Sequence, residues 1–375
     1  MSAKKILYAD FYSFLGGGQI NLLSLFKAMD RQRYSPILVL SKEGPFAQAA
    51  RALKVPVFFV PMGKARWRRP WEALPAFFRL RRLMAEEKVD LVHCNCYPVN
   101  KLAALAARSL GIPSVWHKQI GVTQRPGSST GALWRFFSRF NDRVLAVSRQ
   151  GFEALKALGI QENKLVLFYN NADMGRFASA KPLTPAALKR HKIPSGLPLV
   201  LAAGMRRHHK GFDTLLEAMI RVQTPCYLAL LGDPAQSESG HESLLRRLAS
   251  APELQGRLSV LPAQADLAPW FKSAALFVSS SRLEGSPLVV IEAMAAGCAI
   301  VATRQASGEL IEAGRSGWLC DAEDPEGMAR SIDAALGSPS AREKMGKAAR
   351  EVAEQRFSLT RYATDMASLY DGICQ

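Results

Sequence analysis

The first half of the chain alternates short apolar runs with longer segments of helical periodicity. These runs have the length of a strand and are bounded by turn residues or helical stretches. The runs are KILYAD (5–10), YSPILVLSK (34–42), VPVFFVP (55–61), VDLVHCN (89–95), PSVWHKQ (113–119), DRVLAVS (142–148) and NKLVLFYNN (163–171). Such an alternation predicts a parallel sheet that helices cover on both faces.

The second half repeats this pattern after a break. Residues 179–198 are polar and rich in proline, so they predict a linker. A polar stretch at 355–358 precedes a last segment, 359–373, with apolar residues at helical spacing. The strand candidates in between are LVLAAG (199–204), CYLALLGD (226–233), RLSVLPA (257–263), ALFVSSS (275–281), CAIVATR (298–304) and GWLCD (317–321).

We therefore predict an α/β chain with two Rossmann-like doubly wound domains that face each other across a cleft. Ligands of open parallel sheets bind beyond the carboxyl ends of the strands, which favours a site in that cleft. The expected boundaries are 1–180 for the N-terminal domain, 181–196 for the linker, 197–355 for the C-terminal domain and 356–375 for a terminal helix.

Composition is that of a globular protein. The 375 residues are 48% hydrophobic and 22% charged, enough for two cores. No apolar run reaches the roughly 18 residues of a membrane span, and the N-terminus lacks the apolar stretch of a signal peptide, so we expect a cytoplasmic protein. The six cysteines are scattered. Cys94 and Cys96 follow His93, but no second ligand pair follows at zinc spacing, so we expect no metal.

The formal net charge of +17 and the pI near 9.8 predict anionic partners: nucleic acid, acidic lipid or phosphorylated small molecules. The segment 64–88 concentrates basic residues around Trp67, Trp71, Phe77 and Phe78. Such a basic amphipathic segment is typical of contact with an anionic membrane surface. The alternative is a solvated basic helix whose aromatic side chains pack inward.

The segment EGSPLVVIEAMAAG, 284–297, contains an unusual helix. Ser286 suits an N-cap and Pro287 the first helical position, so we predict a helix over Leu288–Ala296 that Gly297 ends. Free amides at the start of this helix favour a phosphate.

Two carboxylates flank this predicted phosphate site. Glu284 precedes the helix, and Glu292 lies in an otherwise apolar stretch of it. Carboxylates would repel a phosphate, so each makes sense as an acceptor of hydrogen bonds from hydroxyl groups on either side of it. Hydroxylated rings on both sides of a diphosphate describe a sugar nucleotide.

With these residues the chain resembles the retaining glycosyltransferases of family 4, which have the GT-B fold. Glu284 and Glu292 match the Glu-x7-Glu signature, and GMRRHHKG (204–211) is similar to the phosphate-binding loop of the second domain. GGGQ (16–19) resembles the N-terminal glycine loop, and VWHKQ (115–119) the strand that presents a histidine. The resemblance covers nearly the whole chain and implies that the terminal helix crosses back to the N-terminal domain.

The resemblance also implies site residues and a mechanism. Glu284 would bind hydroxyls of the donor sugar and Glu292 the ribose, while Arg206 and Lys210 neutralise the diphosphate. His117 would lie near the reacting sugar. The acceptor hydroxyl would attack from the front side without a metal, because fixed cations stabilise the leaving diphosphate. The backbone groups implied for the donor are those of Gly16, Gly17, Gly18, Gly285, Ser286, Pro287, Leu288 and Val289.

This sequence departs from the family at Met205, where an arginine is usual, so we assign that role to Arg206. The implied partners are a nucleotide-sugar donor, with a UDP-sugar expected, and a glycan or lipid-linked acceptor of cell-surface polysaccharide or lipopolysaccharide synthesis. The protein would then lie at the inner face of the cell membrane.

Other functions stay open. The same basic patch would suit a nucleic-acid-binding protein, but no recognition motif is present and the glutamate pair would be unexplained, so we expect no nucleic acid. A sugar-nucleotide epimerase of the same architecture is the stronger alternative. A dinucleotide oxidoreductase is disfavoured because G-x-G-x-x-G fails at Asn21.

Overall fold

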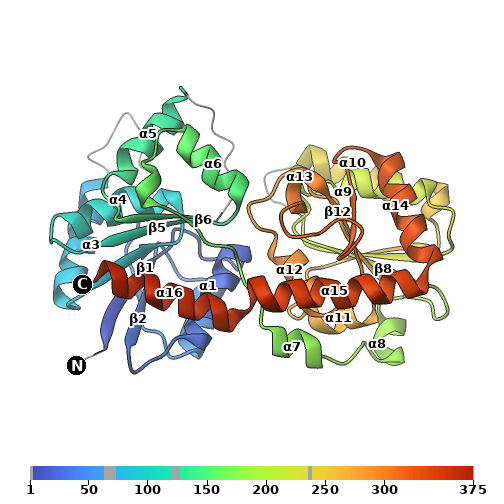
Figure 1. Ribbon diagram of the computed structural model, residues 1–375, viewed down its shortest axis with the longest axis horizontal. Coiled ribbons are helices and arrows are strands. Elements are labelled where there is room, and N and C mark those ends of the chain that lie inside the picture. Colours follow the sequence, from blue (N-terminus) through green and yellow to red (C-terminus); the bar gives the residue numbers. More distant parts are fainter. Residues whose placement is uncertain (1–2, 63–72, 120, 122–126, 235–238, 375) are drawn as a thin grey trace. The chain divides into compact units, whose positions relative to one another are not determined.

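The computed structural model describes residues 3–62, 73–119, 121, 127–234 and 239–374. The chain divides into two compact units, Met1–Asn170 with Leu359–Gln375, and Asn171–Ser358 (Figure 1). Each unit has its own parallel sheet, so the prediction of two Rossmann-like α/β domains is confirmed.

The sheet of the first unit has the strand order β3-β2-β1-β4-β5-β6-β7. Strand β1 pairs on one side with β2 and on the other with β4, so the strand order reverses its direction across the sheet between β1 and β4. The strands are β1 Lys4–Ala9, β2 Tyr34–Leu40, β3 Val57–Phe59, β4 Leu91–Cys94, β5 Ser114–Lys118, β6 Arg143–Ala146 and β7 Leu165–Leu167.

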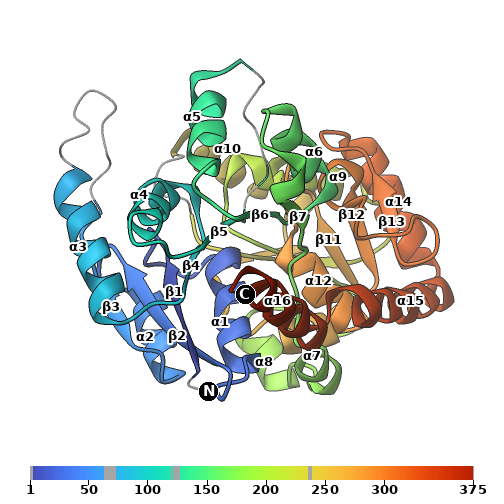
Figure 2. The ribbon, with the colours of Figure 1, turned by 60° about the vertical axis from the view of Figure 1, so that its left-hand side comes forward.

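Alternate residues of β1 face two separate cores, as the period of a strand requires. Ile6 and Tyr8 pack with α1, α2 and the C-terminal helix α16, whereas Leu7 and Ala9 pack with α3 and α4. Figure 2 shows α16 beside α1, in contact with it. The helices of this unit are α1 Gly17–Ala28, α2 Pro45–Ala52, α3 Leu74–Glu86, α4 Tyr97–Arg108, α5 Ser129–Ser138, α6 Arg149–Ala157, η2 Glu162–Lys164 and α16 Leu359–Ile373.

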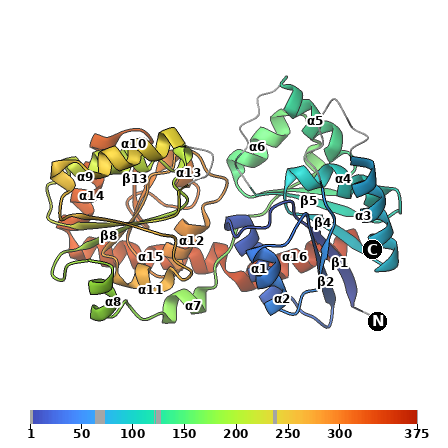
Figure 3. The ribbon, with the colours of Figure 1, turned by 180° about the vertical axis from the view of Figure 1, so that it is seen from behind.

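The sheet of the second unit has the order β10-β9-β8-β11-β12-β13, with its change of direction between β8 and β11. Val200 and Ala202 of β8 face α9, α10 and α14, and Phe277 of β11 meets Phe271 of α11 on the opposite face. Figure 3 shows these two helical layers above and below the sheet. The strands are β8 Leu199–Ala203, β9 Tyr227–Leu231, β10 Leu258–Leu261, β11 Leu276–Ser279, β12 Ile300–Thr303 and β13 Trp318–Cys320.

Helices of the second unit surround this sheet and continue to its boundary with α16. They are α7 Met174–Ser179, α8 Pro185–Arg190, η3 His208–Lys210, α9 Phe212–Arg221, α10 Ser239–Ala249, η4 Pro252–Leu254, α11 Ala268–Ser273, α12 Leu288–Ala295, α13 Arg304–Ser307, α14 Pro325–Gly337 and α15 Pro339–Phe357. Across the described stretches of the chain, none of the helices has the length and apolar content that crossing a bilayer requires.

Three boundaries differ from the sequence prediction. The predicted linker contains α8, because Thr184 caps the amide of Ala187 and Pro185 starts the helix. Helix α12 begins at Leu288, with Pro287 as N-cap, because Pro287 has an extended ψ of 104°. Helix α1 begins at Gly17, so only Gly16 of the glycine triplet lies outside it.

Candidate active site

Two loops meet at the carboxyl edge of the second sheet, where β8 and β11 are neighbours. Residues 204–211 follow β8 and residues 280–287 follow β11. In the sheet, the other neighbour of β8 is β9, and the other neighbour of β11 is β12, so the chain leaves the two strands in opposite directions. This divergence is the position at which open parallel sheets bind ligands.

Hydrogen bonds join the two loops. The amide of Arg282 donates to the carbonyl of His209 at 2.7 Å, and the Ser280 hydroxyl donates to the carbonyl of Lys210 at 2.9 Å. Gly211 allows this contact: its φ is +63°, and a Cβ atom there would lie 2.1 Å from the carbonyl oxygen of Ser280. The close approach of the loops therefore requires glycine.

The predicted pair Lys210 and Glu284 lies across this junction. Lys210 Nζ is 2.5 Å from Glu284 Oε1, which also accepts a hydrogen bond of 2.9 Å from Ser281. The two charged side chains are 20% and 14% exposed. They are held in place, yet solvent reaches both.

Arg206 has a different partner. Its Nε donates to Glu242 Oε2 at 3.0 Å, and Arg246 reaches the other oxygen of Glu242 at 3.2 Å. Glu242 lies in α10, which was not part of the predicted site. Arg206 lies on the same loop as Lys210, and a carboxylate of α10 holds its side chain in place.

The start of α12 has amide groups with no acceptor within the helix. Its first hydrogen bond within the helix runs from the amide of Val290 to Pro287, so the amides of Leu288 and Val289 precede the helical ladder. Gly297, with φ of +72°, ends this helix as predicted. The helix is short. The partial positive charge at its N-terminus therefore acts only near its first turn, where it adds to the positive charge of Lys210.

Glu292 is the partly buried carboxylate of α12. Burial raises its pKa to about 7; Arg176 acts to lower this pKa, and Asp266 raises it further. In the part of the chain that the structure covers, Glu292 has no hydrogen-bond or ion-pair partner. A carboxylate in such surroundings is suited to accept hydrogen bonds from a ligand.

Arg282 was not predicted, and it holds the junction together. It donates two hydrogen bonds to the carboxylate of Asp213, of 2.9 and 2.8 Å, and one of 2.6 Å to the carbonyl of His208. Burial acts to raise the pKa of Asp213, but the bonds from Arg282 outweigh it, and the pKa is lowered. The only signal in the sequence was an arginine two residues before Glu284.

In the first unit, the predicted glycine loop lies beside a buried polar cluster. Gly18 packs against Gln119, since an added Cβ would lie 3.1 Å from its Cγ. Gln19 donates to Asp10 at 2.8 Å. Asp10, at the end of β1, is fully buried and was not predicted; burial raises the pKa of its carboxyl, and the donors around it oppose this.

His117, at the end of β5, belongs to the same cluster and is 1% exposed. Its Nδ1 lies 3.2 Å from both His93 Nε2 and Gln119 Nε2. Burial lowers the pKa of His117 to about 3, so its imidazole is neutral near pH 7. Its Nε2 is buried and has no partner in the described ranges.

Cys94 and Cys96 have ordinary structural roles. Both thiols are buried, and Cys96 Sγ lies 3.4 Å from Asp10 Oδ1. Within residues 3–62, 73–119, 121, 127–234 and 239–374, no group of three His, Cys, Asp or Glu side chains is arranged to hold a metal ion.

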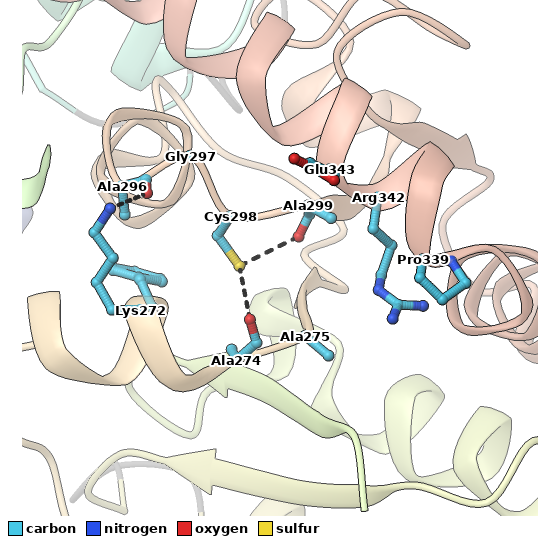
Figure 4. Close-up of a pocket in the computed structure, with 11 residues that line it drawn as sticks. Lys272, Ala274, Ala275, Ala296, Gly297, Cys298, Ala299, Pro339, Arg342 and Glu343 are labelled. Carbon is cyan, nitrogen blue, oxygen red and sulfur yellow. Dashed lines mark hydrogen bonds between the residues drawn. The ribbon is translucent and has the colours of Figure 1, made fainter. Parts of the chain in front are cut away.

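A cavity of about 320 Å³ lies at the opposite edge of the second sheet, where β11 and β12 begin (Figure 4). Its cations already serve helix ends: Lys272 Nζ donates to the carbonyl of Ala296 at 2.9 Å, and Arg342 donates to those of Ala335 and Leu336. Such bonds satisfy the free carbonyls at helix C-termini. The cavity is therefore explained by packing, away from the loops that carry Lys210 and Glu284.

In comparisons with known proteins, both units match glycosyltransferase families. Residues 15–176 match the model of Glycosyltransferase Family 4, and residues 184–352 that of Glycosyl transferases group 1. The lipopolysaccharide core biosynthesis glycosyltransferase LpsE of Rhizobium meliloti is 31% identical over 175 residues, 46% of this chain and 50% of that protein. The chain spans about half the length of the curated relatives that it matches first.

A longer match is a UDP-Gal:alpha-D-GlcNAc-diphosphoundecaprenol alpha-1,3-galactosyltransferase of Escherichia coli, 23% identical over 88% of this chain and 87% of that protein. Among solved structures, Anabaena Alr3699/HepE in complex with UDP has a TM-score of 0.85 at 20% identity, with 98% of this chain and 100% of that chain covered. The same protein has been solved with UDP-glucose. This likeness shows the fold.

Proposed function

Because the chain belongs to the family 4 glycosyltransferases and has their GT-B fold, we propose that it is a retaining enzyme that transfers a sugar from a nucleotide-diphosphate sugar to a hydroxyl group of a glycan or lipid-linked acceptor. The observation that carries this proposal is the junction of the loops after β8 and β11. There a lysine, a glutamate and the start of a helix lie together at the divergence of the sheet.

Each residue of the junction has a role in binding the donor. Lys210 and Arg206 neutralise the diphosphate, and the amides of Leu288 and Val289 donate to its oxygens. Glu284 accepts hydrogen bonds from the sugar, while its bond to Ser281 holds the carboxylate in place. Glu292 accepts from the ribose hydroxyls, which explains a partly buried carboxylate without an internal partner.

The reaction breaks the bond between the anomeric carbon and the diphosphate oxygen and forms a bond from that carbon to the acceptor oxygen. The proton of the acceptor hydroxyl passes to an oxygen of the leaving diphosphate. Negative charge grows on that diphosphate in the transition state, and fixed cations stabilise it there. This chemistry requires no base on the protein and is consistent with retention of the anomeric configuration.

The donor is a UDP-sugar in this proposal, because the structure of HepE, which has the same fold, was solved with UDP and with UDP-glucose. The acceptor is a precursor of lipopolysaccharide or another cell-surface glycan. Two relatives support this class: LpsE is named for lipopolysaccharide core biosynthesis, and the Escherichia coli galactosyltransferase is named for a diphosphoundecaprenol-linked sugar.

A basic face on α3 supports the proposal that the enzyme binds a membrane surface. Ala76, Leu80 and Met84 are buried, whereas Leu74 and Phe78 are 51% and 61% exposed. Trp67 and Trp71 of the predicted segment 64–88 lie outside the described residues. The arginines exposed beside Phe78 are Arg79, Arg81 and Arg82.

Thermal shift with a panel of nucleotide sugars tests the donor. UDP-glucose or UDP-galactose should raise the melting temperature more than GDP-mannose or ADP-glucose, because binding to the folded state stabilises it. Release of UDP that depends on added acceptor would then separate a transferase from an epimerase. No stabilisation by any member of the panel would contradict the proposal.

A further inference from the structure

A chain of buried and partly buried hydrogen bonds runs from Asp10 to His117. Asn95 Nδ2 donates to Asp10 Oδ2 at 2.7 Å, and Gln119 Nε2 donates to Asn95 Oδ1 at 3.0 Å. The same Gln119 Nε2 lies 3.2 Å from His117 Nδ1. Asp10, Asn95 and Gln119 directly follow β1, β4 and β5, His117 lies in β5, and these three strands are neighbours in the first sheet.

Asp10 determines the direction of every bond in this chain. Its carboxylate is surrounded by donors: the amide of Tyr12, the side-chain amides of Gln19 and Asn95, and the Cys96 thiol. Asn95 must therefore turn its Nδ2 toward Asp10, and a contact of that nitrogen with the carbonyl of Gly18 at 3.4 Å agrees. Which end of an amide is nitrogen is decided by such networks.

The orientation of Asn95 then orients Gln119 and His117. Asn95 presents its oxygen to Gln119, so Gln119 must present its nitrogen, which is a donor only. His117 Nδ1 faces this donor and must be an acceptor. A neutral imidazole with an acceptor at Nδ1 carries its proton on Nε2.

A second branch agrees with this direction. His93 Nε2 lies 3.2 Å from His117 Nδ1, and His93 Nδ1 lies 2.8 Å from the hydroxyl of Tyr370 in α16. If His117 Nδ1 accepts, His93 donates from Nε2 and accepts from Tyr370, whose oxygen accepts from Tyr8 at 3.0 Å. Each link then has one donor and one acceptor, and the donors of Gln119 and His93 share the lone pair of His117 Nδ1.

We infer that Asp10, Asn95 and Gln119, supported by His93 and Tyr370, are positioning residues that hold His117 as the neutral Nε2–H tautomer, which donates a hydrogen bond to the substrate. The buried Nε2–H has no partner in the described ranges, and a buried donor without a partner costs roughly 1–3 kcal/mol. That cost is offset when an oxygen of a sugar or phosphate accepts the bond. In this state His117 cannot act as a general base toward the substrate, because Nε2 already carries the proton and Nδ1 accepts hydrogen bonds within the protein. The substrate contact, though not the tautomer, rests on the proposed function.

Two-bond ¹H–¹⁵N correlation spectra of the full chain, labelled with ¹⁵N-histidine, test the tautomer without any substrate. The chain has six histidines, so His117→Gln identifies the signal. His117 should show a protonated Nε2 and an unprotonated Nδ1 at pH 7.5. An Nδ1–H form, or a mixture of the two, would overturn the inference.

Variants test the hydrogen-bond chain itself. Gln119→Glu places an acceptor opposite Nδ1 and should move the proton of His117 from Nε2 to Nδ1, or protonate both nitrogens. Tyr370→Phe should release the tautomer of His93. Tyr362→Phe is the matched control, since Tyr362 is a second buried tyrosine of α16 but accepts a hydrogen bond from Asn21 at 2.8 Å instead. Equal spectra for Tyr370→Phe and Tyr362→Phe would remove Tyr370 from the chain.

Addition of UDP-glucose separates this inference from the proposed function. Contact with the substrate predicts a shift of the His117 Nε2–H signal, and Gln119→Glu should lower kcat by about 10- to 100-fold, the range found for partners that orient metal-ligating histidines. Binding of UDP-glucose by thermal shift with no change at His117, alone or with acceptor, would overturn the substrate contact. Failure of every nucleotide sugar to bind would contradict the proposed function, while the tautomer would still be decided by the spectra.

Discussion

Lys210 and Glu284 form an ion pair at the loop junction, and Glu284 also accepts a hydrogen bond from Ser281. In the proposed donor complex Lys210 would turn to a phosphate, and Glu284 would keep its hydrogen bond from Ser281. The diphosphate would then replace the carboxylate of Glu284 as the partner of Lys210. Lys210 would have one ion-pair partner before and after the donor binds. The Lys210–Glu284 pair is therefore compatible with a preorganised binding site.

Removal of the Lys210 charge should weaken donor binding without unfolding the chain. Lys210→Met should raise the Kd for UDP-glucose by about 10- to 100-fold, as expected for the loss of one charge-assisted hydrogen bond. Isothermal titration measures this. Lys272→Met, at the opposite edge of the same sheet, is the control and should leave the Kd unchanged; equal weakening in both variants would argue for a general effect of charge.

Glu292 should make stability depend on pH. Its pKa is about 7 in the folded chain, against 4.5 for the ordinary group, so the folded state binds the proton more tightly than the unfolded state. The free energy of unfolding therefore falls as pH rises from about 4.5 through about 7, by up to about 3 kcal/mol. Glu292→Gln should remove this part of the pH dependence in urea unfolding.

The same carboxylate should make donor affinity depend on pH in the opposite direction. Ribose hydroxyls donate to the ionised form, so UDP-glucose should bind more tightly as pH rises through about 7. Glu292→Gln should flatten that rise. If wild type and Glu292→Gln followed one curve, Glu292 would not contact the ligand.

At the scale of elements, the close approach of the loops after β8 and β11 depends on Gly211. Gly211→Ala combines a left-handed backbone with a Cβ atom 2.1 Å from the carbonyl oxygen of Ser280. Gly256→Ala is the matched control, since Gly256 has φ of +72° and nothing within 4 Å of the added carbon. Gly256→Ala should cost about 1 kcal/mol and Gly211→Ala at least 1–3 kcal/mol more by chemical unfolding.

If the two alanine variants lost equal stability, strain of the backbone would account for both, and the contact with Ser280 would carry no cost of its own. Donor binding gives a second readout. Gly211→Ala should lower the affinity for UDP-glucose because it separates Lys210 from Glu284, while Gly256→Ala should not.

Elements were predictable where local pattern decides them. Each strand candidate became a strand, because a buried parallel strand is a short apolar run between turns. Element boundaries were predicted less well. Ser286 was predicted as the N-cap of α12, but Pro287 is the N-cap because its ψ, which the sequence does not restrict, is extended. Helix α8 was missed because proline and polar residues, which suggested a linker, also start helices.

Side-chain pairing between distant elements could not be predicted in the same way. Glu284 and Lys210 were chosen from motifs, and the structure brings them together. The choice of Glu242 for Arg206, and the branch from His93 to Tyr370, join residues 36 and 277 positions apart. Such contacts depend on the register of strands and helices, and single residues give no sign of it.

At the scale of the whole molecule, the net charge of +17 is larger than one bound diphosphate would neutralise, and it favours further contact with anionic surfaces. On α3, Leu74 and Phe78 are one helical turn apart, and exposed arginines lie beside them. Arginine side chains reach anionic head groups while the apolar residues enter the head-group region. We therefore expect this face of α3, in the first unit, to bind an anionic bilayer.

Vesicle binding tests this surface. The protein should sediment with vesicles of phosphatidylglycerol and phosphatidylcholine but not with phosphatidylcholine alone, and 1 M salt should release it, because the screening length falls to about 3 Å. Phe78→Ser and Arg81→Ser should each lower the partition coefficient about fivefold, near 1 kcal/mol per group at the surface. Leu197→Ser, which changes a 38% exposed apolar residue of the second unit, should have no effect. If all three variants bound alike, the charge on α3 would serve solubility, and an acceptor at the membrane would have to be reached through another surface.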